Sequence, residues 1–292
     1  MLMQSIAYFF LRVIVILFRW LPFRLLYLLS DGLALLLQHL FRYRKTVIAD
    51  NLRRAFPEKT EHEIRDITRK SYRNLTDVLL ETLKSFSLSV EEITRRCRPV
   101  NPELLNRYLD QNQPLILAGT HLGNWEYSGV SLPTAVHGPT ITAFKSVKNK
   151  DMEGFLNRAR GRSGMKLVQM EEFYRVMRKH SGSAAVFLLL TDQSPSSRKS
   201  AHWVPFLGQS TAHLPGVDVL SRKFGCPVLY YRTERLRRGF YEIVFEEICS
   251  DPSKMPEEGI TKAYAQILER DIRKQPEQWL WSHRRWKMRN EE

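Results

Sequence analysis

The chain has few cysteines and lacks the short motifs that mark most cofactor and nucleophile sites. Cys97, Cys226 and Cys249 show no C-x-x-C spacing, so neither a disulfide framework nor a zinc site is indicated and a reducing compartment fits best. No H-E-x-x-H, Walker A, G-x-G-x-x-G or G-x-S-x-G sequence is present. Because no activated protein nucleophile is evident, direct transfer between two bound substrates is the simplest chemistry for this chain.

Internal repeats, low-complexity segments and long linkers are also missing, which favours one catalytic domain. The 292 residues are 43% hydrophobic, which is ample for a buried core. Acidic residues are outnumbered, since 45 lysines and arginines against 31 aspartates and glutamates give a net charge of +14. Such a balance implies an acidic partner, and charge alone leaves four open: nucleic acid, an anionic lipid surface, a phosphorylated substrate or an acidic protein.

An uncharged run long enough to cross a membrane is lacking near the N-terminus. Residues 1–41 are rich in large apolar side chains, but no uninterrupted stretch reaches the ~18 to 20 residues of a transmembrane helix. The interrupting charges are Arg12, Arg19, Arg24 and Asp31. On a helix Arg12 and Arg19 would share one face and Pro22 would end it, a pattern typical of an element that lies in or dips into a membrane interface.

We therefore predict a membrane anchor over residues 1–45 and a catalytic domain over residues 46–292. The basic residues at 42–45 would stay on the cytoplasmic side of the membrane. The alternative is that residues 1–41 form two amphipathic core helices of a soluble protein.

Beyond the anchor, the pattern predicts an α/β fold with a central sheet flanked by helices. Residues 50–86 are predicted to be helical with a break at Pro57. Short apolar runs bounded by turn residues predict strands at 115–118, 140–144, 166–168, 184–190, 227–231 and 241–245. Helical patterns lie at 152–160, 171–179, 214–224 and 261–273. Such alternation favours an α/β sheet.

His121 and Glu126 are the strongest candidates for catalysis. They stand five positions apart behind the apolar run 115–118, with Gly123 between them. In an unbroken helix this spacing would separate them by about 140°. A strand that ends at His121 and turns through Gly123 into a helix near Asn124 would bring them together as a general base and its orienting carboxylate.

Two further groups could line a site. Arg160 and Arg162 lie with Lys145 and other basic residues between two predicted strands, where they could surround a phosphate or an oxyanion; a solvated helix face is the alternative. Asp192 and Gln193 follow the predicted strand 184–190, and strand ends commonly line α/β sites, although an ordinary turn fits equally well.

Two aromatic segments also leave alternatives open. The loop 202–208 suits an acyl channel or a plain hairpin. The tail 279–289 interleaves aromatic and basic residues, which is typical of nucleic-acid stacking or of indole rings at a lipid headgroup boundary. Because the N-terminus is apolar, we expect the tail to lie at a lipid headgroup boundary and expect no nucleic-acid partner.

Several ordered blocks together resemble the lysophospholipid acyltransferase superfamily, and within it the bacterial late lipid A acyltransferases, the lauroyl and myristoyl transferases. The resemblance runs over nearly the whole chain. His121 and Glu126 match the family's H-x4-[DE] motif. The other matching blocks are N-L-x-x-A-F-P at 51–57, Lys148-Asn149, Arg160-x-Arg162-x-Gly164, Asp192-Gln193 with V-P-F-x-G at 204–208, and the closing P-E-Q-W-L-W-x-H-R-R at 276–285.

The resemblance implies a glycerolphosphate-acyltransferase-like fold and acyl transfer from acyl carrier protein to a hydroxyl of a lipid A precursor. The partners would be this carrier, an anionic glycolipid acceptor and the surface of the bacterial inner membrane, with the active site on the cytoplasmic side and neither metal nor bound cofactor. His121 would be the base, Glu126 its supporting carboxylate, and Arg160 or Arg162 would bind the acceptor or stabilise charge.

The block around Asn149 departs from the family pattern, because Lys145 and Lys150 replace an arginine and a proline. Lysine lacks the bidentate fork of arginine, so acceptor binding is the feature that these departures affect. The same chemistry on a phospholipid, an inositol mannoside or an aminolipid is an alternative, and a non-catalytic basic protein that binds membranes or nucleic acid is another.

Overall fold

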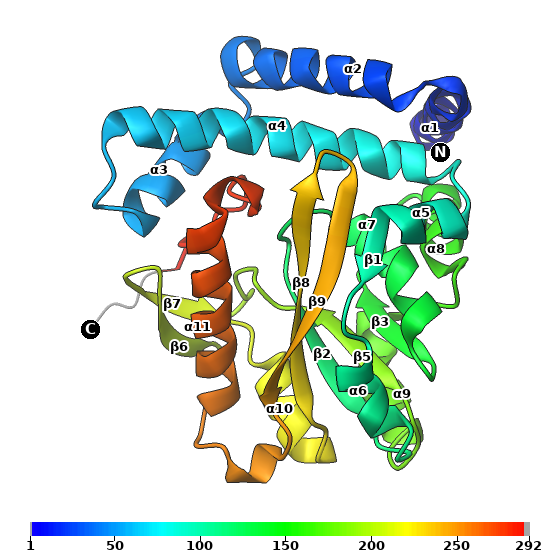
Figure 1. The fold of residues 1–292 in the computed structure, drawn as a ribbon, viewed down its shortest axis with the longest axis vertical. Coiled ribbons are helices and arrows are strands. Elements are labelled where there is room, and N and C mark those ends of the chain that lie inside the picture. The colour runs from blue at the N-terminus through cyan, green and yellow to red at the C-terminus, as the bar shows by residue number, and fades with distance from the viewer. Residues whose placement is uncertain (1, 289–292) are drawn as a thin grey trace.

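The computed structural model describes residues 2–288, which fold around a seven-stranded mixed sheet with strand order β1-β9-β8-β2-β5-β3-β4 (Figure 1). The strands are β1 (Cys97–Pro99), β2 (Leu115–Gly119), β3 (Thr140–Phe144), β4 (Lys166–Gln169), β5 (Val186–Leu190), β8 (Val228–Arg237) and β9 (Phe240–Cys249). All neighbours pair in parallel except β8 and β9, which form an antiparallel hairpin. The predicted mixed sheet flanked by helices is confirmed.

The central strands are apolar on both faces because helices cover both sides of the sheet. Every residue of β2 is buried, as expected for a parallel strand that has no solvated face. The flanking helices are α5 (Val90–Arg96), α6 (Glu103–Leu109), α7 (Trp125–Ser131), α8 (Lys150–Gly161), α9 (Met170–Lys179), α10 (Gly216–Phe224) and α11 (Gly259–Lys274). Three single turns of 3-10 helix complete them: η2 (Leu132–Ala135), η3 (Pro252–Lys254) and η4 (Pro276–Gln278).

The helical region predicted over residues 50–86 consists of two helices, α3 (Lys45–Ala55) and α4 (Glu61–Ser85), and the predicted break at Pro57 separates them. A capping box starts α4, since the Thr60 side chain accepts from the Glu63 amide while the Glu63 carboxylate accepts from the Thr60 amide. In Figure 1, α4 lies across one end of the sheet, next to the tip of the β8–β9 hairpin.

The N-terminal helices α1 (Leu2–Trp20) and α2 (Phe23–Leu35) lie on the outer side of α4 (Figure 1), and the π-helical turn η1 (Leu36–Leu40) continues α2. Polar contacts join α2 to α4: the Ser30 hydroxyl donates to Asp77 at 2.6 Å and the Tyr27 hydroxyl to Glu81 at 3.0 Å. Exposed leucines of α2 stand at 25, 28, 29 and 35, and Leu36 of η1 is exposed as well.

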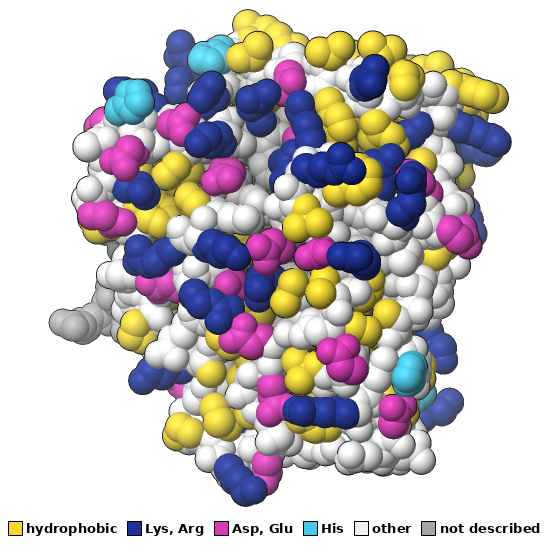
Figure 2. Space-filling view, viewed as in Figure 1, with side chains coloured by type: hydrophobic (Ala, Val, Ile, Leu, Met, Phe, Trp, Pro, Cys, Tyr) yellow, Lys and Arg dark blue, Asp and Glu magenta, His cyan; other side chains and the backbone are white. Residues whose placement is uncertain are grey.

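Figure 2 shows hydrophobic side chains along the edge formed by α1 and α2, with many Lys and Arg side chains beneath them. By length and composition, the segment Phe23–Leu40 is apolar enough to cross a membrane, and only 17% of it is buried in the protein. Such a large uncovered apolar surface is unusual for a monomeric soluble protein and is typical of a membrane or protein interaction site.

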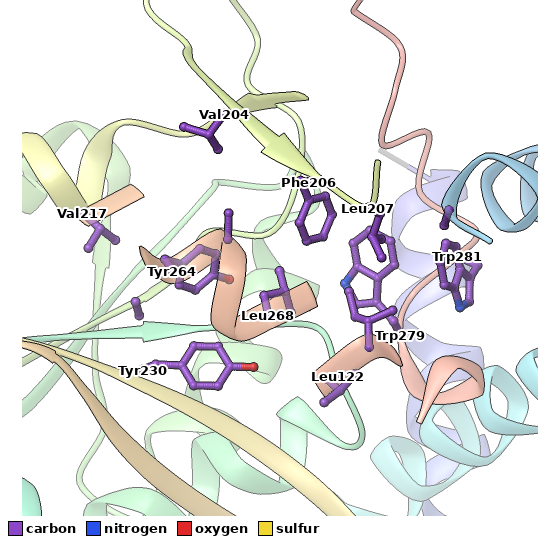
Figure 3. Packing of buried hydrophobic residues seen from close by; sticks show 14 of the residues in the cluster. Leu122, Val204, Phe206, Leu207, Val217, Tyr230, Tyr264, Leu268, Trp279 and Trp281 are labelled. Carbon is purple, nitrogen blue, oxygen red and sulfur yellow. The ribbon is translucent and has the colours of Figure 1, made fainter. Parts of the chain in front are cut away.

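The aromatic C-terminal segment belongs to the core, so the expectation that its indoles lie at a headgroup boundary or bind nucleic acid is wrong. Trp279, Trp281 and Trp286 are 4%, 1% and 8% exposed. Figure 3 shows Trp279 among Phe206, Leu207 and Leu122, and its ring centre is 5.8 Å from that of Phe206. The segment packs against the β6–β7 hairpin with its aromatics turned inward, where burial stabilises them more than a partly wet interface would.

The segment 202–208 is a hairpin rather than an acyl channel. β6 (His202–Phe206) and β7 (Gln209–His213) pair antiparallel through a two-residue turn at Leu207-Gly208. Both turn residues have positive φ, 49° and 75°, as the tight turns that suit the twist of a hairpin require. The hairpin's Val204, Phe206 and Leu207 pack into the core.

Candidate active site

His121 lies two residues beyond β2 on a turn that the sequence specifies closely. Gly123 has a φ of +64°, and a Cβ there would sit 2.2 Å from the carbonyl oxygen of Thr233. Only glycine fits both the conformation and the close approach. Asn124 then caps α7, because its side-chain oxygen accepts from the Tyr127 amide at 2.9 Å. The predicted strand, glycine turn and helix are confirmed.

Asp192 is the carboxylate that orients the His121 ring. Because β2 and β5 are parallel neighbours with Gly119 paired to Leu190, the residues just beyond both strands meet at one edge of the sheet. One oxygen of Asp192 lies 2.6 Å from His121 Nδ1. The other accepts from the His121 amide at 2.9 Å and the Trp279 indole at 2.8 Å.

Glu126 has a different partner, which corrects the prediction that it fixes the tautomer of His121. Both of its carboxylate oxygens accept from Arg160, at 3.0 Å from Nε and 2.6 Å from Nη2. Glu126 stands in the first turn of α7, facing α8, whereas Nδ1 of His121 points back toward the end of β5. The turn therefore brings Glu126 near the histidine, but Asp192 already occupies the position at Nδ1.

The surroundings stabilise the charged form of His121 and the ionised form of Asp192 relative to the same groups in water. Burial opposes the charge on His121, but the charge of Asp192, its hydrogen bond and then the charge of Glu126 raise the pKa of His121 above its usual value. Burial also opposes the charge on Asp192, yet His121 and the Trp279 indole hold the pKa of Asp192 well below its usual range. The pair thus stabilises the imidazolium that forms when His121 Nε2 accepts a proton.

Two side chains flank the reactive nitrogen. The Gln193 amide nitrogen is 3.4 Å from His121 Nε2, so the predicted Asp192-Gln193 strand end does reach the site. The Trp125 ring meets the imidazole edge to face, with centres 5.0 Å apart. These contacts hold the ring in place and leave one side of it open.

That open side faces a cavity of about 280 Å³ between α7, α8 and the ends of β3 and β5. We call it the acyl cavity after the hydrocarbon chain that its largely apolar lining suits. Its polar wall contains His121, Glu126, Arg160 and Lys145. The rest is largely apolar and includes Leu156, Met165, Leu167, Leu188, Leu190 and Tyr231. A base at the mouth of an apolar cavity suits a substrate with a reactive end and a hydrocarbon chain.

The remaining predicted site residues lie outside the lining of this cavity. Arg162 donates to the backbone oxygen of Ser85 at 2.8 Å, which ties α8 to the end of α4. Asn149 caps α8 by accepting from the Met152 amide at 3.1 Å. Among the predicted basic residues, Arg160 and Lys145 are thus the ones that the fold brings to His121.

Trp279 is a site residue that the sequence did not reveal. Its indole holds the oxygen of Asp192 that does not face Nδ1, from a segment 87 residues further along the chain. Trp279 does lie in the matching block at 276–285, but a sequence motif does not indicate which side chain a tryptophan contacts in the fold.

Comparison with known proteins places the chain in a family. Residues 1–288 match the model of the bacterial lipid A biosynthesis acyltransferases. The chain belongs to this family. It is 25% identical over 273 residues, 92% of the chain and 87% of the relative, to the lipid A biosynthesis palmitoleoyltransferase of Escherichia coli. The lauroyltransferase of that organism is 24% identical over 93% of the chain and 88% of its own length.

A lipid A biosynthesis acyltransferase of Haemophilus influenzae is 22% identical, over 91% of the chain and 83% of its own length. The resemblance to lipid A acyltransferases is therefore confirmed. The protein is an acyltransferase of lipid A biosynthesis by family.

Proposed function

We propose that the protein moves a fatty acyl chain from an acyl carrier protein thioester to a hydroxyl group of a lipid A precursor at a membrane surface. The observation that carries the proposal is the His121–Asp192 pair at the mouth of the acyl cavity, beside the Glu126–Arg160 ion pair. Family membership supports the acyl and lipid A parts of the proposal.

The acceptor hydroxyl attacks the thioester carbonyl carbon while His121 Nε2 takes its proton. The C–S bond then breaks, and the leaving thiolate receives that proton from the imidazolium. Asp192 holds the proton on Nδ1, so that Nε2 is free to act as the base, and its charge stabilises the imidazolium. Positioned proton transfer of this kind contributes about 100- to 10,000-fold in rate.

Arg160 supplies positive charge near the reacting carbonyl. Its bidentate bond to Glu126 fixes the guanidinium in the wall of the cavity, where it can stabilise the oxyanion or the acceptor. Glu126 thereby acts through Arg160, and its negative charge also raises the pKa of His121. This assigns Glu126 a supporting role that differs from the one its motif suggested.

The net charge of the chain supports the proposed acyl donor, and the exposed apolar side of α1 and α2 supports the proposed membrane contact. A net charge of +14 suits an acidic carrier protein and an anionic glycolipid. We place α1 and α2 on the cytoplasmic face of the inner membrane with their apolar side in the lipid. A spanning α2 would have to abandon its contacts with α4 and the β8–β9 turn, including the Asp31 ion pairs to Arg73 of α4 at 3.0 Å and to Arg238 of the turn at 2.8 Å. A helix that lies in the interface is therefore favoured.

The test uses purified enzyme in detergent with a lipid A precursor and acyl donors of several lengths, each as a carrier-protein thioester and as a coenzyme A thioester. We expect the product to gain one acyl group by mass spectrometry, with carrier-protein donors preferred. Acylation of glycerophospholipids but not of lipid A precursors would refute the acceptor. Persistence of transfer in a folded His121→Ala variant would refute the base.

A further inference from the structure

A second cavity of about 1010 Å³ lies between the start of α3 and the C-terminal segment 283–287, and we call it the basic cavity. Six cationic side chains line it: Arg42, Arg44, Lys45, Arg53, Arg284 and Lys287. Within residues 2–288, Asp50 is the one acidic side chain of its wall. It shares no lining residue with the acyl cavity.

Most of these positive charges have no negative counterpart. Arg53 pairs with Glu61 at 2.8 Å and lies 3.7 Å from Asp50. Arg42, Lys45, Arg284 and Lys287 form no ion pair with any carboxylate in the described part of the chain. Like charges that converge on a cavity repel one another, so an anion bound among them would relieve that repulsion.

The walls of the basic cavity are held together by specific contacts between distant segments. The buried Asn51 side chain donates to the backbone oxygens of Trp281 at 2.9 Å and His283 at 2.8 Å. The Arg44 guanidinium donates to the backbone oxygen of Ser282 at 2.9 Å. The N-L-x-x-A-F-P block and the closing W-x-H block thus meet here, although neither contributes a side chain to the acyl cavity.

The start of α3 presents backbone donors to the same cavity. No side chain caps this helix and its first turn contains no acidic residue, while Lys45, Thr46 and Val47 line the cavity. The Lys45 amide donates to the backbone oxygen of Arg42 at 3.2 Å. Cations beside a helix N-terminus oppose the helix dipole, whereas an anion bound there would complement the dipole and could accept from the next amides of the first turn.

The basic cavity also lies between the exposed apolar edge formed by α1 and α2, which we call the apolar edge, and the loop after β5 that carries Asp192. Leu40 and Phe41, 68% and 66% exposed, directly precede Arg42. On the other side, the Ser194 hydroxyl donates to the backbone oxygens of Arg284 at 3.2 Å and Arg285 at 2.5 Å, two residues beyond Asp192. A lipid headgroup that rests below the apolar edge would therefore reach the basic cavity on its way to His121.

We infer that the basic cavity binds a phosphate group of the acceptor lipid's headgroup, while the acyl chain of the donor occupies the acyl cavity. The inference rests on the proposed function, because it takes the acceptor to be a phosphorylated lipid. The volume of the basic cavity, about 1010 Å³, is at the upper end of that of small-molecule sites. A carrier protein would instead need a contact surface of several hundred Å².

The experiment compares the wild type with the double variant Lys45→Gln/Lys287→Gln. The matched control is Lys254→Gln/Lys262→Gln, which removes the same charge from exposed lysines that line neither cavity. Binding is measured to neutral vesicles that contain the phosphorylated acceptor, the same acceptor after phosphatase treatment, or phosphatidylglycerol. The KM values for acceptor and acyl donor are measured in parallel.

We expect Lys45→Gln/Lys287→Gln to raise the acceptor KM roughly 30-fold, about 1 kcal/mol for each lysine, and to leave the donor KM unchanged. The preference of the wild type for the phosphorylated acceptor should vanish in this variant and persist in the control. An equal loss in both variants would overturn the inference in favour of general surface charge. A raised donor KM would indicate carrier docking, and equal binding of phosphatidylglycerol would indicate a bulk-lipid site; each would also overturn it.

The vesicle binding needs no turnover, which separates this inference from the proposed function. If the wild type binds the phosphorylated acceptor through Lys45 and Lys287 but transfers no acyl group to it, the proposed function fails and the phosphate site stands. If it transfers the acyl group without any preference for the phosphate, the phosphate site fails and the proposed function stands.

Discussion

Replacing Asp192 with asparagine tests which carboxylate controls His121. One oxygen of Asp192 accepts from three donors, the His121 amide, the Thr120 hydroxyl and the Trp279 indole, and the other faces His121 Nδ1. Asparagine has one oxygen and one NH₂ group. If its oxygen keeps the three donors, its NH₂ faces Nδ1 and forces the proton of His121 onto Nε2, where the base is needed.

The opposite orientation would restore the correct tautomer at a high cost. The NH₂ group would then face two buried N–H donors, on His121 and Trp279, which would lose their acceptor at about 1 to 3 kcal/mol each. The total of about 2 to 6 kcal/mol corresponds to a loss of roughly 30- to 25,000-fold in kcat. The loss of about 10,000-fold for the corresponding substitution in Ser-His-Asp proteases falls within this range.

The assay measures kcat and the pH profile of kcat/KM for wild type, Asp192→Asn and Glu126→Gln, with circular dichroism to confirm folding. Activity needs the neutral imidazole, so the rate should rise with pH through the raised pKa of the His121–Asp192 pair. In Asp192→Asn this limb should move to lower pH, and in Glu126→Gln it should move less, because Glu126 contributes the smaller effect. If Asp192→Asn keeps more than about a tenth of the wild-type kcat, the activation free energy has risen by less than about 1.36 kcal/mol, and Asp192 does not control the tautomer of His121.

Three other predictions address the cavity, the membrane surface and the core. Gly129 lines the acyl cavity, and nothing lies within 4 Å of where its Cβ would stand, so the Gly129→Leu variant should fold. Its kcat/KM should fall about fourfold, about 0.8 kcal/mol, for each CH₂ of the acyl chain that the leucine excludes. An unchanged chain-length preference would contradict this. Leu28→Glu/Leu29→Glu should weaken vesicle binding at least roughly 100-fold, about 1.5 kcal/mol per leucine, with an unchanged melting temperature. Burial raises the pKa of Glu81, so the stability that comes with its protonated form is full below about pH 4 and is lost as the pH rises through the pKa of the folded state. The urea midpoint of unfolding should therefore fall less across this range in Glu81→Gln than in wild type.

The local order of the site could be predicted, because it depends on residues close together in the chain. The run 115–118, the glycine at 123 and the cap at Asn124 each have a local signature, and the structure contains the strand, turn and helix that they predict. The partner of His121 could not be predicted, since it depends on β2 and β5 being neighbours in the sheet. Strand order is set by how whole helices and strands pack, and Glu126 was the nearest carboxylate in sequence only.

The aromatic tail was misinterpreted for a related reason. Alternating tryptophans and arginines look alike whether the rings face lipid or core, and the difference lies in what covers them. Here Phe206 and Leu207 of the β6–β7 hairpin cover the rings, and the sequence of 202–208 is itself compatible with a hairpin or a channel loop.

The C-terminal segment connects the catalytic pair His121–Asp192 to the wall of the basic cavity. Trp279 donates to Asp192, and four residues later the backbone oxygen of His283 accepts from Asn51 in α3. A displacement of the segment would therefore disturb the hydrogen bonding of the orienting carboxylate and the wall of the basic cavity at once. Because both ends of this span are hydrogen-bonded to other parts of the fold, the segment fixes the distance between base and headgroup site. An acceptor bound by its phosphate would thus present its hydroxyl at a set position relative to His121, and such positioning is a main source of rate acceleration in a transfer between two bound substrates.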